Sequence, residues 1–196
     1  MTETQWNAVS SFRTRFKEQL TKWTNEIETK NLKELLLTIQ KEGAKKDGVP
    51  PYSLDNFLVY NKALDDITKE DRISLIVIGD NPGKEEQLNK NCRYLVGQSG
   101  KIAEGFFKRN PELNTDFRKN VIILNKTPLH TAKTKELSLI KKYNSPILDT
   151  IFLESQIWMA TNTALLHEEL CKEHSGSCQL WLVGYGELKE RSLFTL

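Results

Sequence analysis

The sequence predicts an α/β fold, namely a three-layer α/β/α sandwich around a short, mainly parallel sheet, with a helical extension at its N-terminus. Three short runs rich in β-branched and other apolar residues predict buried strands, at residues 74–79, 120–124 and 179–184. Helical stretches over residues 99–109 and about 146–173 alternate with them, a pattern typical of parallel sheets covered by helices. Ligands of such sheets bind at the carboxyl ends of the strands, so function is expected where each strand ends.

The N-terminal extension is predicted from helical spacing. Apolar residues recur every three or four positions from Trp6 to Ile27, which indicates one stripe of a long amphipathic helix, and Leu32 to Ile39 continue in a second helical stretch. The stripe could serve a partner, but packing on its own domain is the favoured use. Residues 43–51 (GAKKDGVPP) predict a linker, because glycine and paired prolines interrupt both helix and strand. We therefore expect an extension over residues 1–50 and an α/β domain over residues 51–196.

Composition narrows the classes of protein. The 196 residues are 38% hydrophobic and 28% charged, which suits a globular domain with a full core and excludes a disordered tail. No apolar run reaches the roughly 18 residues that a membrane helix needs, and the start of the chain has no secretion signal. Three cysteines are too few for a disulfide scaffold and favour a reducing compartment. We expect a cytoplasmic monomer without membrane contact.

The first predicted strand runs into the turn Gly79-Asp80-Asn81-Pro82-Gly83. Glycine and proline make this turn stiff and exposed, so that its amides can face a ligand oxygen. Asp80 and Asn81 stand at the tip, where they could orient a water or accept a proton. An ordinary strand-to-helix turn uses the same residue types, so the motif alone leaves both interpretations open.

The second predicted strand leads into Asn125, and the residues Lys-Thr-Pro-Leu-His-Thr follow it. An asparagine in this position offers one acceptor and two donors to an amide-like edge, such as that of a pyrimidine. A core-edge asparagine bonded to the backbone is the alternative. Pro128 fixes the turn, and we expect His130 to project into the same region as Asn125.

Four segments in this order, GDNPG, RYLVGQSGK, NVIILNKTPLHT and QLWLVGYG, closely resemble the uracil-DNA glycosylase superfamily. The first three are similar to motifs of its thermophilic iron–sulfur type, and FLVYN at residues 57–61 is similar to a segment of its single-strand-selective type. The resemblance spans roughly residues 55–186. It implies a DNA glycosylase that hydrolyses the N-glycosidic bond of uracil or a related damaged base in base-excision repair, acting on a base flipped out of DNA.

The resemblance also implies roles for individual residues. Asp80 matches the acidic residue that activates water, and Asn81 matches the asparagine or aspartate that other branches use. Asn125 matches the asparagine that reads the base edge, and the turn from Gly79 to Pro82 would cradle a pyrimidine carbonyl through its amides. A carboxylate beside the sugar would stabilise an oxocarbenium-like transition state electrostatically.

Several features of the family are missing or changed. Its base-stacking phenylalanine falls on Leu95, with Tyr94 in the preceding position, where the tyrosine could supply a ring if the loop tilts. The four cysteines of an iron–sulfur cluster are absent, so we expect no cofactor and no metal. No loop of the H-P-S-P kind follows the third strand before Leu196, so either the chain is truncated or it is a divergent member with reduced or no activity. His130 could take over the role of the missing histidine.

Charge is uneven along the chain. Residues 84–142 hold 13 Lys or Arg against 6 Asp or Glu, although the whole chain carries a net charge of only +2. This is the footprint of a protein that binds a phosphate backbone, which makes DNA the expected partner. A solvated basic face without function is the alternative.

A row of histidines and cysteines suggests a different chemistry. His167, Cys171, His174 and Cys178 recur at intervals of four, three and four, and the first three share one face of a helix, as metal ligands could. Accidental spacing on a partly buried helix is favoured over a zinc-dependent hydrolase. The main alternative to a glycosylase is a catalytically impaired member of the same fold that binds nucleic acid or a nucleotide.

Overall fold

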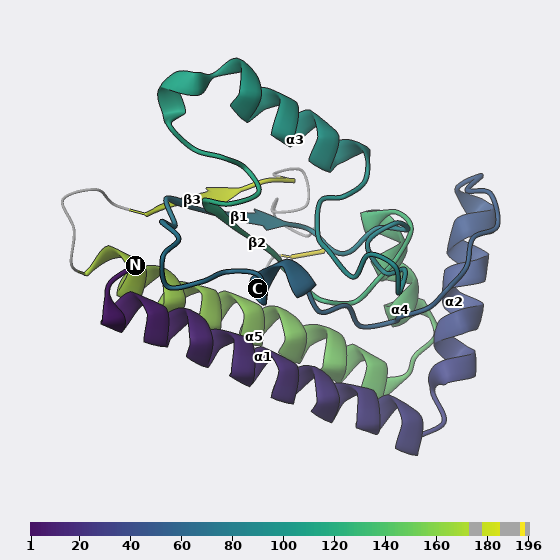
Figure 1. The fold of residues 1–196 in the computed structure, drawn as a ribbon. Coiled ribbons are helices and arrows are strands. Elements are labelled where there is room, and N and C mark those ends of the chain that lie inside the picture. Colours follow the sequence, from purple (N-terminus) through teal and green to yellow (C-terminus); the bar gives the residue numbers. More distant parts are fainter. Residues whose placement is uncertain (173–177, 185–192, 195–196) are drawn as a thin grey trace.

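The computed structural model describes residues 1–172, 178–184 and 193–194. These residues form a mixed α/β fold with one small parallel sheet and five α-helices (Figure 1). The strands are β1 (Leu75–Gly79), β2 (Val121–Asn125) and β3 (Gln179–Leu182), in the order β2-β1-β3. The helices are α1 (Glu3–Thr29), α2 (Lys33–Lys46), α3 (Gln98–Arg109), α4 (Ser138–Lys142) and α5 (Pro146–Cys171). None of these helices has the length and apolarity to cross a membrane. The prediction of an α/β fold with a parallel sheet is confirmed.

The three strands run parallel and in close register. Leu75 of β1 pairs with Val121 of β2 and with Gln179 of β3, and Gly79 at the end of β1 pairs with Asn125 at the end of β2. Parallel strands in this register place their carboxyl ends at one edge of the sheet. The ends of the first two strands, with Asp80 and Asn125, therefore lie side by side.

The two faces of the sheet bury different clusters, because successive side chains of a strand alternate between faces. On one face, Ile76, Ile122 and Leu124 belong to a core that also includes buried residues of α1 and α5. The other face belongs to a separate cluster that includes α3, with Leu75, Val77, Val121, Ile123 and Phe107. Figure 1 shows α3 on one side of the sheet and the long helices α1 and α5 on the other.

Helix α1 begins at a capping box, in which the Thr2 hydroxyl accepts from the Gln5 backbone N–H and the Gln5 side chain accepts from the Thr2 backbone N–H. The rings of Phe16 in α1 and Trp158 in α5 stack at a centroid distance of 5.3 Å. The apolar stripe of α1 is buried on its own chain, as expected, through Val9, Phe12, Phe16, Leu20, Trp23 and Ile27. The N-terminal helix thus shares one core with the sheet.

Helix α2 runs to Lys46, so the predicted linker over residues 43–51 is wrong for residues 43–46. Gly43 lies within the helix, where the Glu136 side chain packs against it so closely that a Cβ at Gly43 would stand 3.0 Å from Glu136 Cγ. Glycine serves close approach here and does not end the helix. The break comes after the helix, at Gly48, which has a φ of +62°.

An extended segment, residues 57–59, covers the second strand exit. The Val59 N–H donates to the Pro128 carbonyl at 3.0 Å, and the His130 N–H donates to the Phe57 carbonyl at 2.8 Å. These bonds flank an antiparallel bridge between this segment and the chain that follows β2. As a result, the whole stretch from β2 to residue 131 is buried.

Candidate functional site at the strand exits

Asp80, the first residue after β1, is held by a lysine from the neighbouring strand exit. The Lys126 ammonium forms an ion pair with the Asp80 carboxylate and donates to the Val183 carbonyl at 2.9 Å. Both side chains are largely buried, with exposed fractions of 18% for Asp80 and 8% for Lys126. Because water scarcely reaches the pair, each ion depends on the other for the stabilisation that solvent would otherwise give.

The end of β3 leaves the space that the Asp80 carboxylate occupies. Gly184 has a φ of +78°, and a Cβ on it would lie 2.3 and 2.4 Å from the two carboxylate oxygens. A side chain at this position and Asp80 in its present orientation exclude each other. All three strand exits thus meet at the carboxylate, with Asp80 after β1, Lys126 after β2 and Gly184 after β3.

Asn125 has a buried side chain whose amide donor lacks a partner. Its exposed fraction is 2%, and its Nδ2 makes no hydrogen bond with any residue that the structure describes. Its Oδ1 lies so close to Gly79 that a Cβ on that glycine would stand only 2.6 Å away. An unpaired buried donor costs about 1–3 kcal/mol. The alternative of an asparagine bonded to the backbone does not account for this donor.

Asn81 ties the two strand exits together. Its Nδ2 donates to Thr131 Oγ1 at 2.8 Å and to the Leu129 carbonyl at 3.2 Å. Asn81 was expected at the tip of the turn, able to orient a water or accept a proton; in the structure the loop after β2 takes up its amide donors. The contact fixes the turn that carries Asp80.

His130 is buried beneath the first strand exit with both ring nitrogens engaged. Nδ1 lies 2.8 Å from the Pro82 carbonyl, and Nε2 lies 3.0 Å from the Tyr52 hydroxyl. Because a carbonyl only accepts, Nδ1 carries the proton and the Tyr52 hydroxyl donates to Nε2. Burial lowers the pKa of His130 from 6.5 to about 4, so the imidazole is neutral at pH 7. His130 therefore lies against the Pro82 turn, as expected of its region, but both ring nitrogens are bonded within the chain and the residue braces that turn.

The segment matched to the family's stacking residue belongs to the core. Tyr94 is 1% exposed and its hydroxyl donates to the Val59 carbonyl at 2.6 Å, so its ring offers no face to a base. Leu95, with a φ of +52°, donates its N–H to Glu86 Oε1 at 2.9 Å. Glu86 Oε2 accepts from the Gly83 N–H at 3.3 Å, so one carboxyl group connects this segment to the first turn. Burial raises the pKa of Glu86 from 4.5 to about 7.

Two residues of this arrangement were not singled out from the sequence. Lys126 directly follows the last residue of a buried strand, and a charged residue in that position is a signal that could have found it. Glu86 carries no such signal, because it is one of two adjacent glutamates in a polar stretch. In the folded chain its carboxylate is buried and accepts from the Leu95 N–H.

A small cavity of about 160 Å³ lies beside these exits. Asn125 and Lys126 line it, together with Gln156 of α5 and Phe194. The Lys126 ammonium lies 5.1 Å from the centre of the Phe194 ring, within the range of a cation–π contact. A water occupies about 30 Å³ in the liquid, so this cavity suits a small group or a few waters.

The basic stretch predicted to contact phosphate is partly neutralised by ion pairs, as between Arg93 and Asp66 and between Lys108 and Glu104. Other members are exposed and form no ion pair within the described residues, namely Lys90, Lys101, Arg109 and Lys119. Exposed unpaired cations are available to phosphates, but a solvated face would have the same features. The DNA contact stays a prediction.

The row of histidines and cysteines anchors β3 to α5. His167 Nε2 lies 2.8 Å from the Cys178 carbonyl, and Cys171 Sγ donates to the same carbonyl at 3.5 Å. His174 lies outside the described residues. Within the part of the chain that the structure describes, no group of three or more His, Cys, Asp or Glu side chains is arranged to hold a metal ion.

Comparisons with protein-family models, with curated proteins and with solved structures found no match to this chain. The resemblance to the uracil-DNA glycosylase superfamily therefore rests on the four sequence motifs and stays a prediction. The geometry defines a class of site, which is a largely buried polar cluster at the carboxyl edge of a parallel sheet. It holds one ion pair and one amide donor that no described residue satisfies.

Proposed function

We propose that this chain is a DNA glycosylase that hydrolyses the N-glycosidic bond of uracil or a related damaged base, on a three-layer α/β/α fold of the uracil-DNA glycosylase type. The observation that carries the proposal is the Asn125 amide, a buried donor without a partner among the described residues. It lies at the edge of the sheet where ligands of parallel sheets bind. A pyrimidine carbonyl would accept from Nδ2 and its ring N–H would donate to Oδ1, which removes the cost of the unpaired donor.

In the proposed reaction, Asp80 acts on the sugar side of the bond. Its carboxylate would stabilise the positive charge that develops on the sugar as the bond between C1′ and the base nitrogen breaks, with the electron pair leaving on the base. It would also orient the water that adds to C1′ and take up the proton which that water releases. Lys126 holds the carboxylate in one orientation and Gly184 leaves the space for it. On the base side, the Asn125 donor would stabilise the negative charge on the departing carbonyl oxygen. His130 has no part in this step, because both of its nitrogens are engaged.

DNA is the proposed partner, bound by a monomer. Exposed lysines and arginines such as Lys101 and Arg109, which form no ion pair within the described residues, would contact the phosphates. Each phosphate contact releases counterions, so the affinity would fall steeply as salt concentration rises.

A second candidate function is base binding without hydrolysis, by a member of the same fold. The ion pair between Asp80 and Lys126 favours it, because the ammonium occupies and neutralises the carboxylate that hydrolysis would use. The bonds of His130 to Pro82 and Tyr52 favour it as well, since they occupy the histidine that the sequence suggested for assisting the leaving base.

Alkali-induced strand cleavage of a single-stranded oligonucleotide with one uracil separates the two functions when the full chain is used. Asp80→Asn is the test variant because its amide oxygen can still accept from Lys126, whereas alanine would leave a buried lysine unpaired. If the chain is a glycosylase, we expect a loss of roughly 10²–10⁴-fold, and full activity in Glu85→Gln, an exposed carboxylate of the same turn.

Asn125→Leu completes the design, because it removes the amide without changing the net charge. A glycosylase should lose uracil cleavage in this variant, while circular dichroism still reports a folded chain. Saturable binding of uracil-containing DNA without cleavage, lost in Asn125→Leu, would establish the binding function instead. If the parent chain neither cleaves nor binds uracil-containing DNA, both functions are refuted.

A further inference from the structure

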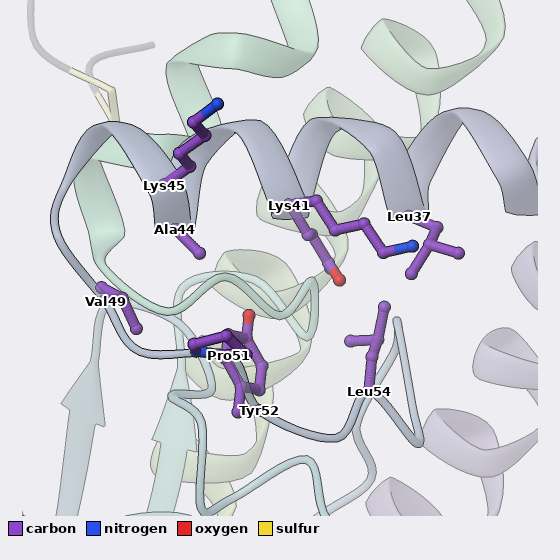
Figure 2. Close-up of a pocket in the computed structure, with 9 residues that line it drawn as sticks. Leu37, Lys41, Ala44, Lys45, Val49, Pro51, Tyr52 and Leu54 are labelled. Carbon is purple, nitrogen blue, oxygen red and sulfur yellow. The ribbon is translucent and has the colours of Figure 1, made fainter.

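A second and larger cavity, of about 550 Å³, lies between α2 and residues 49–54 (Figure 2). Its volume falls in the range of small-molecule sites, which are mostly apolar with a few fixed polar groups. In Figure 2 the helix contributes side chains from above and the following chain contributes them from below. The apolar part of the lining consists of Leu37, Ala44, Val49, Pro51 and Leu54.

One polar residue in this lining has an unused acceptor. Gln40 is 4% exposed, and its Nε2 donates to the His130 carbonyl at 2.8 Å. That bond fixes the amide, while Oε1 accepts no hydrogen bond from any residue that the structure describes. Buried acceptors are normally paired, so a hydrogen-bond donor in the cavity would complete this group.

The lining also carries positive charge. Lys41 and Lys45 stand one helical turn apart on α2, and neither forms an ion pair within the described residues. In Figure 2 the Lys41 side chain extends over the cavity toward Leu37 and Leu54, whereas the Lys45 ammonium points away from it. Lys41 is therefore the cation placed to meet an anionic group at the mouth of the cavity.

The geometry points to a binding site for a small apolar carboxylic acid that also carries one hydrogen-bond donor, such as a hydroxylated aromatic acid. The apolar body would lie between the side chains of Leu37, Val49 and Leu54, and its carboxylate would lie at Lys41. The donor would reach Gln40 Oε1. This site is separate from Asn125 and Asp80, and the assignment does not depend on the proposed glycosylase function.

Hydrogen bonds through His130 connect the lining of this cavity with the turn after β1. Gln40 and Tyr52 both line the cavity and both bond to His130, through its carbonyl at 2.8 Å and its Nε2 at 3.0 Å. His130 in turn donates from Nδ1 to the Pro82 carbonyl at 2.8 Å. A ligand bonded to Gln40 therefore contacts a residue that is hydrogen-bonded to His130, and we expect the His130 imidazole to report its binding.

The test uses 6-hydroxy-2-naphthoate as a fluorescent probe, titrated into the full-length chain. We expect saturable binding with one probe per chain and a shift of the His130 imidazole signals in NMR spectra. 2-Naphthoate, which lacks the donor, and 2-naphthol, which lacks the carboxylate, should each bind more weakly. Lys41→Gln should weaken binding of the acid about fivefold, the worth of a solvent-exposed ion pair, and Lys45→Gln should change it less than twofold.

Two further variants place an aromatic ring in the cavity and should exclude the probe. Ala44→Phe should abolish binding, and Val49→Phe serves the same purpose from the opposite wall if the helix variant fails to fold. Both are checked by circular dichroism, and each that folds must lose the probe. Binding that survives in the filled variants, no saturable binding by the parent chain, or equal affinity for 2-naphthol and the acid would overturn the assignment.

Discussion

Two buried titratable groups beside the candidate site have opposite effects on stability, and their opposition is testable. Glu86 has a pKa raised by burial to about 7, and His130 has a pKa lowered by burial to about 4. Glu86 connects the Gly83 and Leu95 backbones, and His130 braces Pro82. Both groups therefore act on the turn that carries Asp80.

The sign of each effect follows from proton linkage. The folded protein binds the Glu86 proton more tightly than the unfolded chain, so the contribution of Glu86 to the free energy of unfolding decreases as pH rises from 4.5 to about 7. The unfolded chain binds the His130 proton more tightly, so its contribution increases as pH rises from about 4 to 6.5. At about 1.4 kcal/mol for each tenfold change in proton affinity, each effect amounts to about 3 kcal/mol.

Because the two slopes oppose each other between pH 4.5 and 6.5, their sum in the parent chain is nearly flat there. Glu86→Gln removes one slope, so its free energy of unfolding should rise relative to that of the parent by about 3 kcal/mol between pH 4.5 and 7. His130→Asn keeps a donor for the Pro82 carbonyl and removes the other slope, so its free energy of unfolding should fall relative to that of the parent by about 3 kcal/mol between pH 4 and 6.5.

The assay is urea unfolding followed by far-ultraviolet circular dichroism at half-unit steps from pH 4 to 8. Glu136, whose pKa burial also raises, is present in every variant and cancels in the differences. Glu85→Gln is the matched control, because that exposed neighbour should give a curve parallel to the parent. A Glu86→Gln curve that is also parallel to the parent would show that Glu86 titrates near its ordinary pKa and would refute the argument from burial.

The remaining predictions concern the strand exits themselves. Lys126→Met should lower the free energy of unfolding by about 3–5 kcal/mol because it leaves the Asp80 carboxylate unpaired, and Asp80→Asn combined with Lys126→Met should recover much of that loss in urea unfolding. Gly184→Ala should lower the melting temperature more than Gly48→Ala, since both positions have a positive φ but only the Cβ at 184 meets the Asp80 oxygens. Asn125→Leu should keep or raise the free energy of unfolding by up to about 1–3 kcal/mol, because it removes an unpaired donor; a loss above 2 kcal/mol would show that the amide is satisfied in the folded chain.

Periodicity predicted the fold well where the elements are long or strongly apolar. The stripe from Trp6 to Ile27 and the apolar runs of β1 and β2 need no distant contact to be recognised. The end of α2 was misplaced because Gly43 has a packing role that depends on Glu136, far away in the sequence. Local composition cannot distinguish a glycine that ends a helix from one that admits a neighbour.

The site was predicted only in part. Placing Asp80 and Asn125 at the ends of parallel strands was enough to bring them to one edge. The surroundings of Asn81 and His130 could not be predicted, because their partners lie in the loop after β2 and in the segment around Tyr52, whose packing depends on the tertiary fold. The sequence predicted functional roles for Asn81 and His130, whereas in the structure their hydrogen bonds fix the turn after β1.

Polar residues at the strand exits can be ranked by how far folding alone explains them. Asn81, His130 and Asp80 have partners that account for their positions, so no ligand is needed to explain them. Asn125 Nδ2 and Gln40 Oε1 have none among the described residues, and both belong to residues packed at the loop after β2. A folded chain keeps a buried polar atom unpaired at a cost, which a bound molecule or an ordered water would remove. Binding experiments therefore have more to gain from these two amides than from Asp80, whose charge Lys126 already compensates.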